Sequence, residues 1–216
     1  MIKWFEPWPR AWRNGNYRSQ FFTTIPVLLA MLLSLRVFLE FIEHRPGVVL
    51  HDPLINVFTP VDLSWITFSI IYAGLLLGII ALSFNPWELL RTLQAYIMMV
   101  AVRIVVMYFL PLDPPQGLIP LHDPFVEYFG AGTVLTRDLF FSGHTATLVL
   151  IALGIPWRDL KIVFFVAAAA VALLVLWQHV HYTIDVVAAP FFALASYHLA
   201  GLQSVKEPPK TPPKTR

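Results

Sequence analysis

Two short polar motifs in the second half of the chain contain residues suited to catalysis. Residues 138–145 read Asp-Leu-Phe-Phe-Ser-Gly-His-Thr, and residues 179–185 read His-Val-His-Tyr-Thr-Ile-Asp. Histidine can act as a nucleophile or as a general acid and base near neutral pH. His181 and Asp185 are four residues apart and would share one face of a helix, where the carboxylate fixes the imidazole tautomer. This pair predicts an activated nucleophile.

The first motif also predicts a phosphate site. Ser142, Gly143 and His144 begin an apolar run, so we expect them to open a helix. The N–H groups and the dipole of a helix start bind phosphate oxygens, and Gly143 lets the backbone approach closely. His144 can protonate a leaving oxygen and later deprotonate an acceptor. Arg103, in an earlier apolar run, can clamp the same phosphate.

The elements between the motifs predict how these residues meet. Two apolar runs, 146–156 and 162–177, are joined by a short charged turn. This pattern predicts a helical hairpin across a membrane, which returns both motifs to one side. His144, His181 and Asp185 are then neighbours in space, and phosphoryl transfer on a lipid is the chemistry they indicate.

Composition sets the class of protein. The 216-residue chain is 57% hydrophobic and 13% charged, which is typical of a polytopic membrane protein. It has no cysteine, which excludes disulfides, thiolate catalysis and zinc sites with cysteine ligands. A metal site of His179, His181 and Asp185 would need an extended backbone. We therefore expect no metal, no cofactor and no nucleic-acid partner, while the oligomeric state stays open.

The apolar runs predict an all-α fold with six membrane-spanning helices. We expect spans at residues 21–43, 65–83, 89–110, 140–157, 161–179 and 182–203. The fourth has roughly 18 residues and would extend about 27 Å, just enough to cross the membrane.

The two ends of the sequence differ in composition from the apolar region between them. Residues 1–20 mix tryptophans with lysine and arginines, which predicts an amphipathic segment at the headgroup level. A signal peptide is the alternative, but the next apolar run is too long for one. Residues 204–216 are basic and rich in proline, which predicts disorder. The catalytic domain is therefore predicted to be the six-helix region 21–203.

The positive charges predict the orientation. With a cytoplasmic N-terminus, eleven of the fifteen lysines and arginines fall in cytoplasmic segments. These are Lys3, Arg10, Arg13, Arg18, Arg91, Arg158, Lys161, Lys206, Lys210, Lys214 and Arg216. Only Arg45 and Arg137 fall in the opposite loops, and Arg36 and Arg103 lie within spans. This bias predicts that both termini are cytoplasmic and that both motifs lie on the non-cytosolic side.

Several of these residues have simpler interpretations. A lone buried histidine can merely hydrogen-bond across helices. Asp138 can cap the fourth span or orient a histidine. Tyr182 can contact a quaternary ammonium headgroup or only anchor the chain at the interface. Arg36 can pair with Glu40, four residues further on.

The motifs resemble those of the sphingomyelin synthase family, a branch of the type 2 phosphatidic acid phosphatase superfamily. Residues 138–145 look like that family's third motif and residues 179–185 like its fourth. Arg103 is similar to the second motif, and residues 51–58 weakly resemble the first. Phe141 stands where the parent phosphatases have proline, and the Lys…Arg-Pro motif of those enzymes is missing.

The resemblance implies a six-span enzyme that acts on the non-cytosolic leaflet. Its members move a phospho-headgroup from a glycerophospholipid to ceramide through a phosphohistidine. For this chain we expect a lipid acceptor such as ceramide or diacylglycerol. By this resemblance His181 is the nucleophile, Asp185 orients it and His144 is the general acid and base. The residues expected to bind the phosphate or headgroup are Arg103, Ser142, Gly143, Asp138 and Tyr182. A lipid phosphate phosphatase, with water as acceptor, and an inactive lipid-headgroup binder are the alternatives.

Overall fold

The structure is a computed structural model that describes residues 7–57, 59–122 and 135–207. The described residues form a bundle of helices, with one isolated β-bridge, between Val48 and Leu112. The helices are α1 (Pro7–Arg13), α2 (Gly15–Glu43), α3 (Ser64–Ser83), α4 (Pro86–Phe109), α6 (Gly143–Gly154), α7 (Arg158–Trp177) and α8 (Thr183–Gln203), with the 3₁₀ helix η1 (Ile55–Val57).

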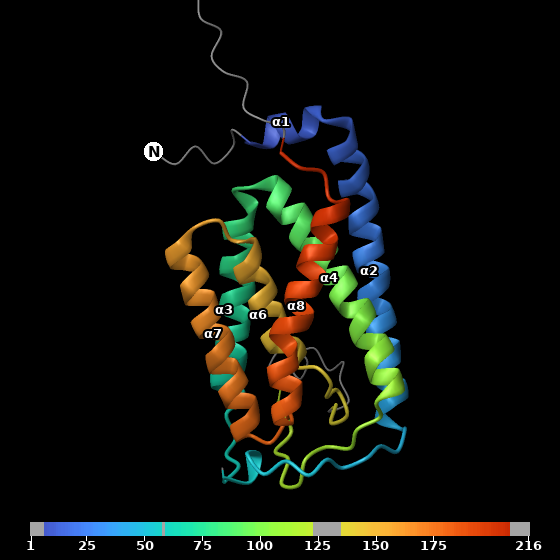
Figure 1. The fold of residues 1–216 in the computed structure, drawn as a ribbon, viewed down its shortest axis with the longest axis vertical. Coiled ribbons are helices and arrows are strands. Elements are labelled where there is room, and N and C mark those ends of the chain that lie inside the picture. Colours follow the sequence, from blue (N-terminus) through green and yellow to red (C-terminus); the bar gives the residue numbers. More distant parts are fainter. Residues whose placement is uncertain (1–6, 58, 123–134, 208–216) are drawn as a thin grey trace, which may run out of the picture.

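Five of these helices, α2, α3, α4, α7 and α8, are long and apolar enough to cross a membrane. The predicted all-α, multi-pass membrane class is therefore supported by the length and composition of the helices. From α2 to α8, with the short α6 included, successive helices run in opposite directions, as Figure 1 shows. As a result, the described parts of both chain ends lie at the same end of the bundle.

The two ends of the bundle differ in composition. The loop end, as we call it, contains residues 44–63, 110–122, 135–142 and 178–182 (Figure 1). The opposite end, here the terminal end, contains α1, the tight turns after α3 and α6, and the end of α8. Both sequence motifs reach the loop end.

At the terminal end, side chains near the beginning of the chain join the ends of α8 and α3. Gln20 donates its side-chain N–H to the Gln203 carbonyl (2.9 Å), and Trp8 donates its indole N–H to the Ser83 carbonyl (2.8 Å). Asn14 caps α2 by accepting hydrogen bonds from the backbone of the first turn. Because of this cap, α2 begins at Gly15 and includes residues that the sequence assigned to a separate interfacial segment.

The short helix α6 corrects the predicted fourth span, 140–157. Its 12 residues extend about 18 Å, which is less than the apolar thickness of a bilayer, about 30 Å. The helix ends because Ile155 is extended ahead of Pro156. Packing explains why so short a helix is tolerated: α3, α4, α7 and α8 surround it. Eight of its 12 residues are buried in these contacts.

Two glycines let α3 pack closely against α6. A methyl group added to Gly74 would lie 2.6 Å from the Leu148 side chain, and one added to Gly78 would lie 2.6 Å from Ile151. Small residues allow membrane helices to approach this closely. The contact fixes α6 in the centre of the bundle, and with it the first turn that carries His144.

Candidate active site

The two motifs meet at the loop end through their backbones. The Ser142 N–H, just before α6, donates a hydrogen bond of 3.1 Å to the carbonyl of Asp185, in the first turn of α8. The contact confirms that the two motifs are neighbours, as the helical hairpin predicted. It arises because α7 carries the chain back from the terminal end to the loop end (Figure 1).

His181 and Asp185 form a completely buried pair. His181 is 1% exposed and Asp185 0%, and Nδ1 of the histidine lies 3.4 Å from Oδ2 of the carboxylate. The predicted shared helical face is wrong, because α8 begins only at Thr183. The backbone turns before the helix instead, and Oδ2 also accepts a hydrogen bond from the Tyr182 N–H (2.9 Å).

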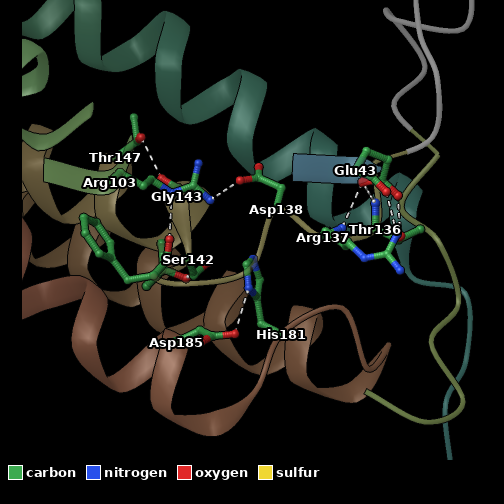
Figure 2. A network of polar contacts seen from close by, with 12 residues as sticks. Glu43, Arg103, Thr136, Arg137, Asp138, Ser142, Gly143, Thr147, His181 and Asp185 are labelled. Atoms are coloured by element: carbon green, nitrogen blue, oxygen red, sulfur yellow. Dashed lines mark hydrogen bonds and ion pairs between the residues drawn. The ribbon is translucent and has the colours of Figure 1, made fainter. Parts of the chain in front are cut away.

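The orientation of His181 suits a nucleophile. Because the carboxylate lies at Nδ1, Nε2 is the ring nitrogen left to react. Figure 2 shows the His181 side chain pointing from the loop before α8 toward the segment that carries Asp138 and Ser142. Within the described part of the chain, Oδ1 of Asp185 has no hydrogen-bond partner.

The first turn of α6 has the expected helix start. Gly143 is the first helical residue and the completely buried Ser142 is the N-cap residue. The Ser142 hydroxyl makes no capping bond; it donates to the Thr145 hydroxyl instead (3.1 Å). The serine side chain therefore leaves the backbone N–H groups of the first turn uncapped, which suits an anion.

Arg103 of α4 lies against this helix start and is 5% exposed. Its Nε donates to the Phe141 carbonyl (2.8 Å), and its Nη2 lies 2.7 Å from Oδ1 of Asp138 (Figure 2). A methyl group added to Gly143 would lie 3.0 Å from Cζ and from Nη1 of Arg103. Asp138 thus pairs with an arginine, and its predicted role as the helix cap is wrong, since Ser142 holds that position.

Some of these groups line one cleft, whereas the buried His181, Asp185 and Ser142 are not among its lining residues. A cavity of about 280 Å³ has a polar wall formed by Arg103, Asp138, Gly143, His144 and Thr147. The His144 ring packs edge-on against Phe68 of α3, with 5.9 Å between the ring centroids. The cleft therefore combines an arginine, a histidine and a helix start, the three groups expected to act on a phosphate.

Tyr182 does not have the predicted headgroup contact. Its side chain is completely buried, so no ring face is open to a quaternary ammonium group. Its hydroxyl donates to the Asp113 carbonyl (2.8 Å) and accepts from the Leu50 N–H (3.1 Å). The tyrosine instead joins three segments of the loop end.

An ion-pair network that the sequence did not reveal fixes the segment before Asp138. Glu43, the last residue of α2, accepts hydrogen bonds from the backbone N–H groups of Thr136 (2.9 Å) and Arg137 (3.0 Å). Figure 2 shows Glu43 beside Thr136 and Arg137. The Arg137 Nε also lies 2.7 Å from Oδ1 of Asp113. No sequence signal links Glu43 to Arg137, because the contact depends on how α2 is placed in the bundle.

Asp52 similarly anchors the start of α8. Its carboxylate accepts hydrogen bonds from the Thr183 N–H (2.6 Å) and the Thr183 hydroxyl (3.1 Å). Burial alone would raise the pKa of Asp52, but these bonds and the backbone bonds from Leu54 and Ile55 outweigh it and lower the pKa. The carboxylate therefore stays ionised at neutral pH and holds Thr183, two residues after His181.

His179 lies outside this group. It has a left-handed backbone (φ 58°), and its Nδ1 lies 2.9 Å from the Gln116 carbonyl oxygen. Among the described residues, no three histidine, aspartate or glutamate side chains are arranged to hold a metal ion. Metal independence remains a prediction.

Comparison with protein-family models gives no match for this chain, and comparison with curated proteins gives none either. The likeness to sphingomyelin synthases therefore depends on the motif residues alone.

Proposed function

We propose that the protein is a membrane phosphotransferase that moves a phospho-headgroup from a glycerophospholipid to a lipid acceptor such as ceramide or diacylglycerol. The observation that carries the proposal is the cleft. Arg103, His144 and the uncapped start of α6 line it, and the Ser142–Asp185 hydrogen bond ties its wall to the His181–Asp185 pair.

In the first half-reaction, Nε2 of His181 attacks phosphorus and a P–N bond forms. The bond between phosphorus and the glycerol oxygen breaks, and protonated His144 gives its proton to that oxygen. Diacylglycerol leaves and a phosphohistidine remains. Asp185 stabilises the positive charge on the His181 ring, as the carboxylate of a catalytic triad does.

In the second half-reaction, the acceptor hydroxyl gives its proton to His144. The acceptor oxygen attacks phosphorus, the P–N bond breaks and His181 is restored. Splitting the transfer into two displacements replaces one difficult step by two easier ones. Both steps use the same histidine, first as the acid and then as the base.

Charge on the transferred phosphate needs stabilisation in both steps. Arg103 supplies a guanidinium, and the α6 start supplies N–H groups and the helix dipole. Asp138 holds Nη2 of Arg103 and so positions the guanidinium, while Nη1 lies over Gly143. The proposed mechanism needs no metal and no cofactor.

We further propose six membrane crossings, with the terminal end in the cytoplasm. The short α6 and the residues on either side of it would make the fourth crossing, shielded from lipid by the helices around it. The excess of lysine and arginine in segments at the terminal end supports this orientation. The catalytic groups would then act on the non-cytosolic leaflet.

A headgroup-exchange assay tests the function. Purified protein in lipid vesicles receives phosphatidylcholine or phosphatidylethanolamine labelled in the headgroup, with ceramide or diacylglycerol as acceptor. We expect label in a new lipid and none with the His144→Ala or His181→Ala variant. Release of label into water, whatever acceptor is present, would instead assign a lipid phosphate phosphatase. Binding of the lipid without exchange or release would assign an inactive binder.

A further inference from the structure

The catalytic cleft continues beyond its polar groups into the apolar part of the bundle. Its remaining wall is mostly hydrocarbon, contributed by three helices, and also includes two tyrosines, Tyr72 and Tyr96. The side chains that matter here are Leu35 and Leu39 of α2, Phe68 and Leu75 of α3, and Met99 and Val100 of α4. A cavity with such a wall favours an apolar occupant, because water there would find few hydrogen-bond partners.

The cleft is deep as well as apolar. Its lining on α3 extends from Phe68 to Leu75, and its lining on α4 extends from Arg103 to Tyr96. Seven residues of helix correspond to about 10 Å along the axis. In both helices the direction is away from the loop end, toward the middle of the bundle (Figure 1). The cleft therefore points from the phosphate-binding groups toward the depth where lipid chains lie.

One polar side chain interrupts the apolar wall near the helix start. The Thr147 hydroxyl donates to the Gly143 carbonyl (2.7 Å). Thr147 lies one helical turn after Gly143, between the start of α6 and the deep apolar part. A lipid has the same order of groups: a phosphate, a polar linkage and then a hydrocarbon chain.

We propose that this cleft binds one hydrocarbon chain of the lipid substrate, with the chain's end beside Leu75 and its polar linkage beside Thr147. The inference rests on the proposed function for the identity of the headgroup, but the chain site itself is defined by the cleft. The helices that form the walls indicate that the bound chain comes from a lipid of the membrane. Leu33 of α2 and Leu77 of α3 are 65% and 53% exposed, so both wall helices also present apolar faces to the bilayer.

A matched pair of variants on α3 tests the chain site. Leu75→Trp fills the deep end of the cleft, whereas Leu77→Trp adds the same ring on an exposed position of the same helix. We expect Leu75→Trp to lower kcat/KM for a dioleoyl phospholipid about 10-fold. For the dihexanoyl analogue, whose chains are shorter, kcat/KM should change little. Leu77→Trp should leave both values unchanged. Equal losses on both substrates, or no loss, would overturn the proposal.

Binding can be measured without turnover. A phospholipid with a diazirine near the end of its acyl chain should label the α3 and α4 peptides around Leu75 and Val100. Labelling should fall in Leu75→Trp and persist in Leu77→Trp and in His181→Ala. Labelling without turnover would refute the proposed function and keep the chain site. Turnover without this labelling would refute the chain site and keep the proposed function. If Leu75→Trp does not fold, Leu75→Phe repeats both measurements with a smaller ring.

Discussion

Helix α4 has an arginine near each end, and their surroundings differ. Arg91, at the terminal end, lies 3.8 Å above the Tyr197 ring centroid and bonds to the Tyr197 carbonyl through Nε and Nη2 (3.4 and 3.2 Å). The Tyr197 hydroxyl donates to Glu88 (2.6 Å), which lies 4.0 Å from Arg91 Nη1. The charged groups of this cluster pair with one another and with Tyr197, and the cluster joins α4 to α8.

Arg103, at the loop end, forms an open arrangement instead. It is held by Asp138 and by the Phe141 carbonyl, but its guanidinium also forms part of a cleft wall. Nearby, the buried Asp185 keeps one oxygen without a hydrogen-bond partner among the residues described. Buried polar groups with unused bonding capacity are typical of functional sites, whereas closed clusters are typical of helix packing. The contrast predicts a structural role for Arg91 and a binding role for Arg103.

We expect the largest difference in turnover between alanine variants of two histidines near α8. We expect His181→Ala to lower turnover about 1,000-fold or more, because the nucleophile is lost. His198→Ala, at an exposed position toward the terminal end, should keep nearly normal turnover. Label transfer by the purified, folded variants measures both. Comparable activity in the two variants would remove His181 from the reaction.

The two arginines give the next largest difference. Arg103→Lys should lower kcat/KM about 100-fold, because lysine cannot reproduce the planar contacts of guanidinium with phosphate. Arg91→Lys should leave kcat/KM nearly unchanged and lower the free energy of unfolding by about 1 kcal/mol, the size of a cation–π contact. Kinetics and thermal unfolding in detergent measure the two effects. A kinetic loss in Arg91→Lys would contradict the assignment.

Gly143 lies against Arg103 and Gly201 lies against Arg91, so alanine at each glycine gives a second comparison of the two arginines. In Gly143→Ala the new methyl group would lie 3.0 Å from the Arg103 guanidinium and displace it from the helix start. We expect a loss of about 10-fold or more in kcat/KM, because small displacements at a reacting centre are costly. Gly201→Ala crowds Arg91 in the same way and should change only the melting temperature. A kinetic loss of equal size in both variants would show general strain instead.

The smallest effect concerns the loop that holds α8. The folded pKa of Asp52 is below its unfolded value, so its stabilisation is complete above the unfolded pKa and is lost as pH falls through the folded one. Wild-type protein should therefore lose about 1 kcal/mol of stability on acidification below about pH 4, relative to Asp52→Asn. Melting temperatures of the two proteins from pH 7 to pH 3 test this. Parallel curves would rule out the ionised carboxylate as the anchor.

The positions of the long helices could be predicted from the sequence because they depend on local properties. An apolar run of about 20 residues must become a helix in lipid, since its backbone groups have no other partners. Hence α3 (Ser64–Ser83) and α7 (Arg158–Trp177) begin and end close to the predicted boundaries. The hairpin followed from the same property, and it brought the segments of His144 and Asp185 to the same end.

Only the tertiary structure decided the rest. The length of α6 depends on burial among four other helices, which hydropathy does not measure. The pairing of Asp138 with Arg103 and of Glu43 with Arg137 joins residues far apart in the chain, so no spacing rule applies to them. The residue types that suggest catalysis were evident from the sequence by itself. Helix packing alone sets the distances between the charged side chains. It therefore decides which charges pair with one another and which line a cleft.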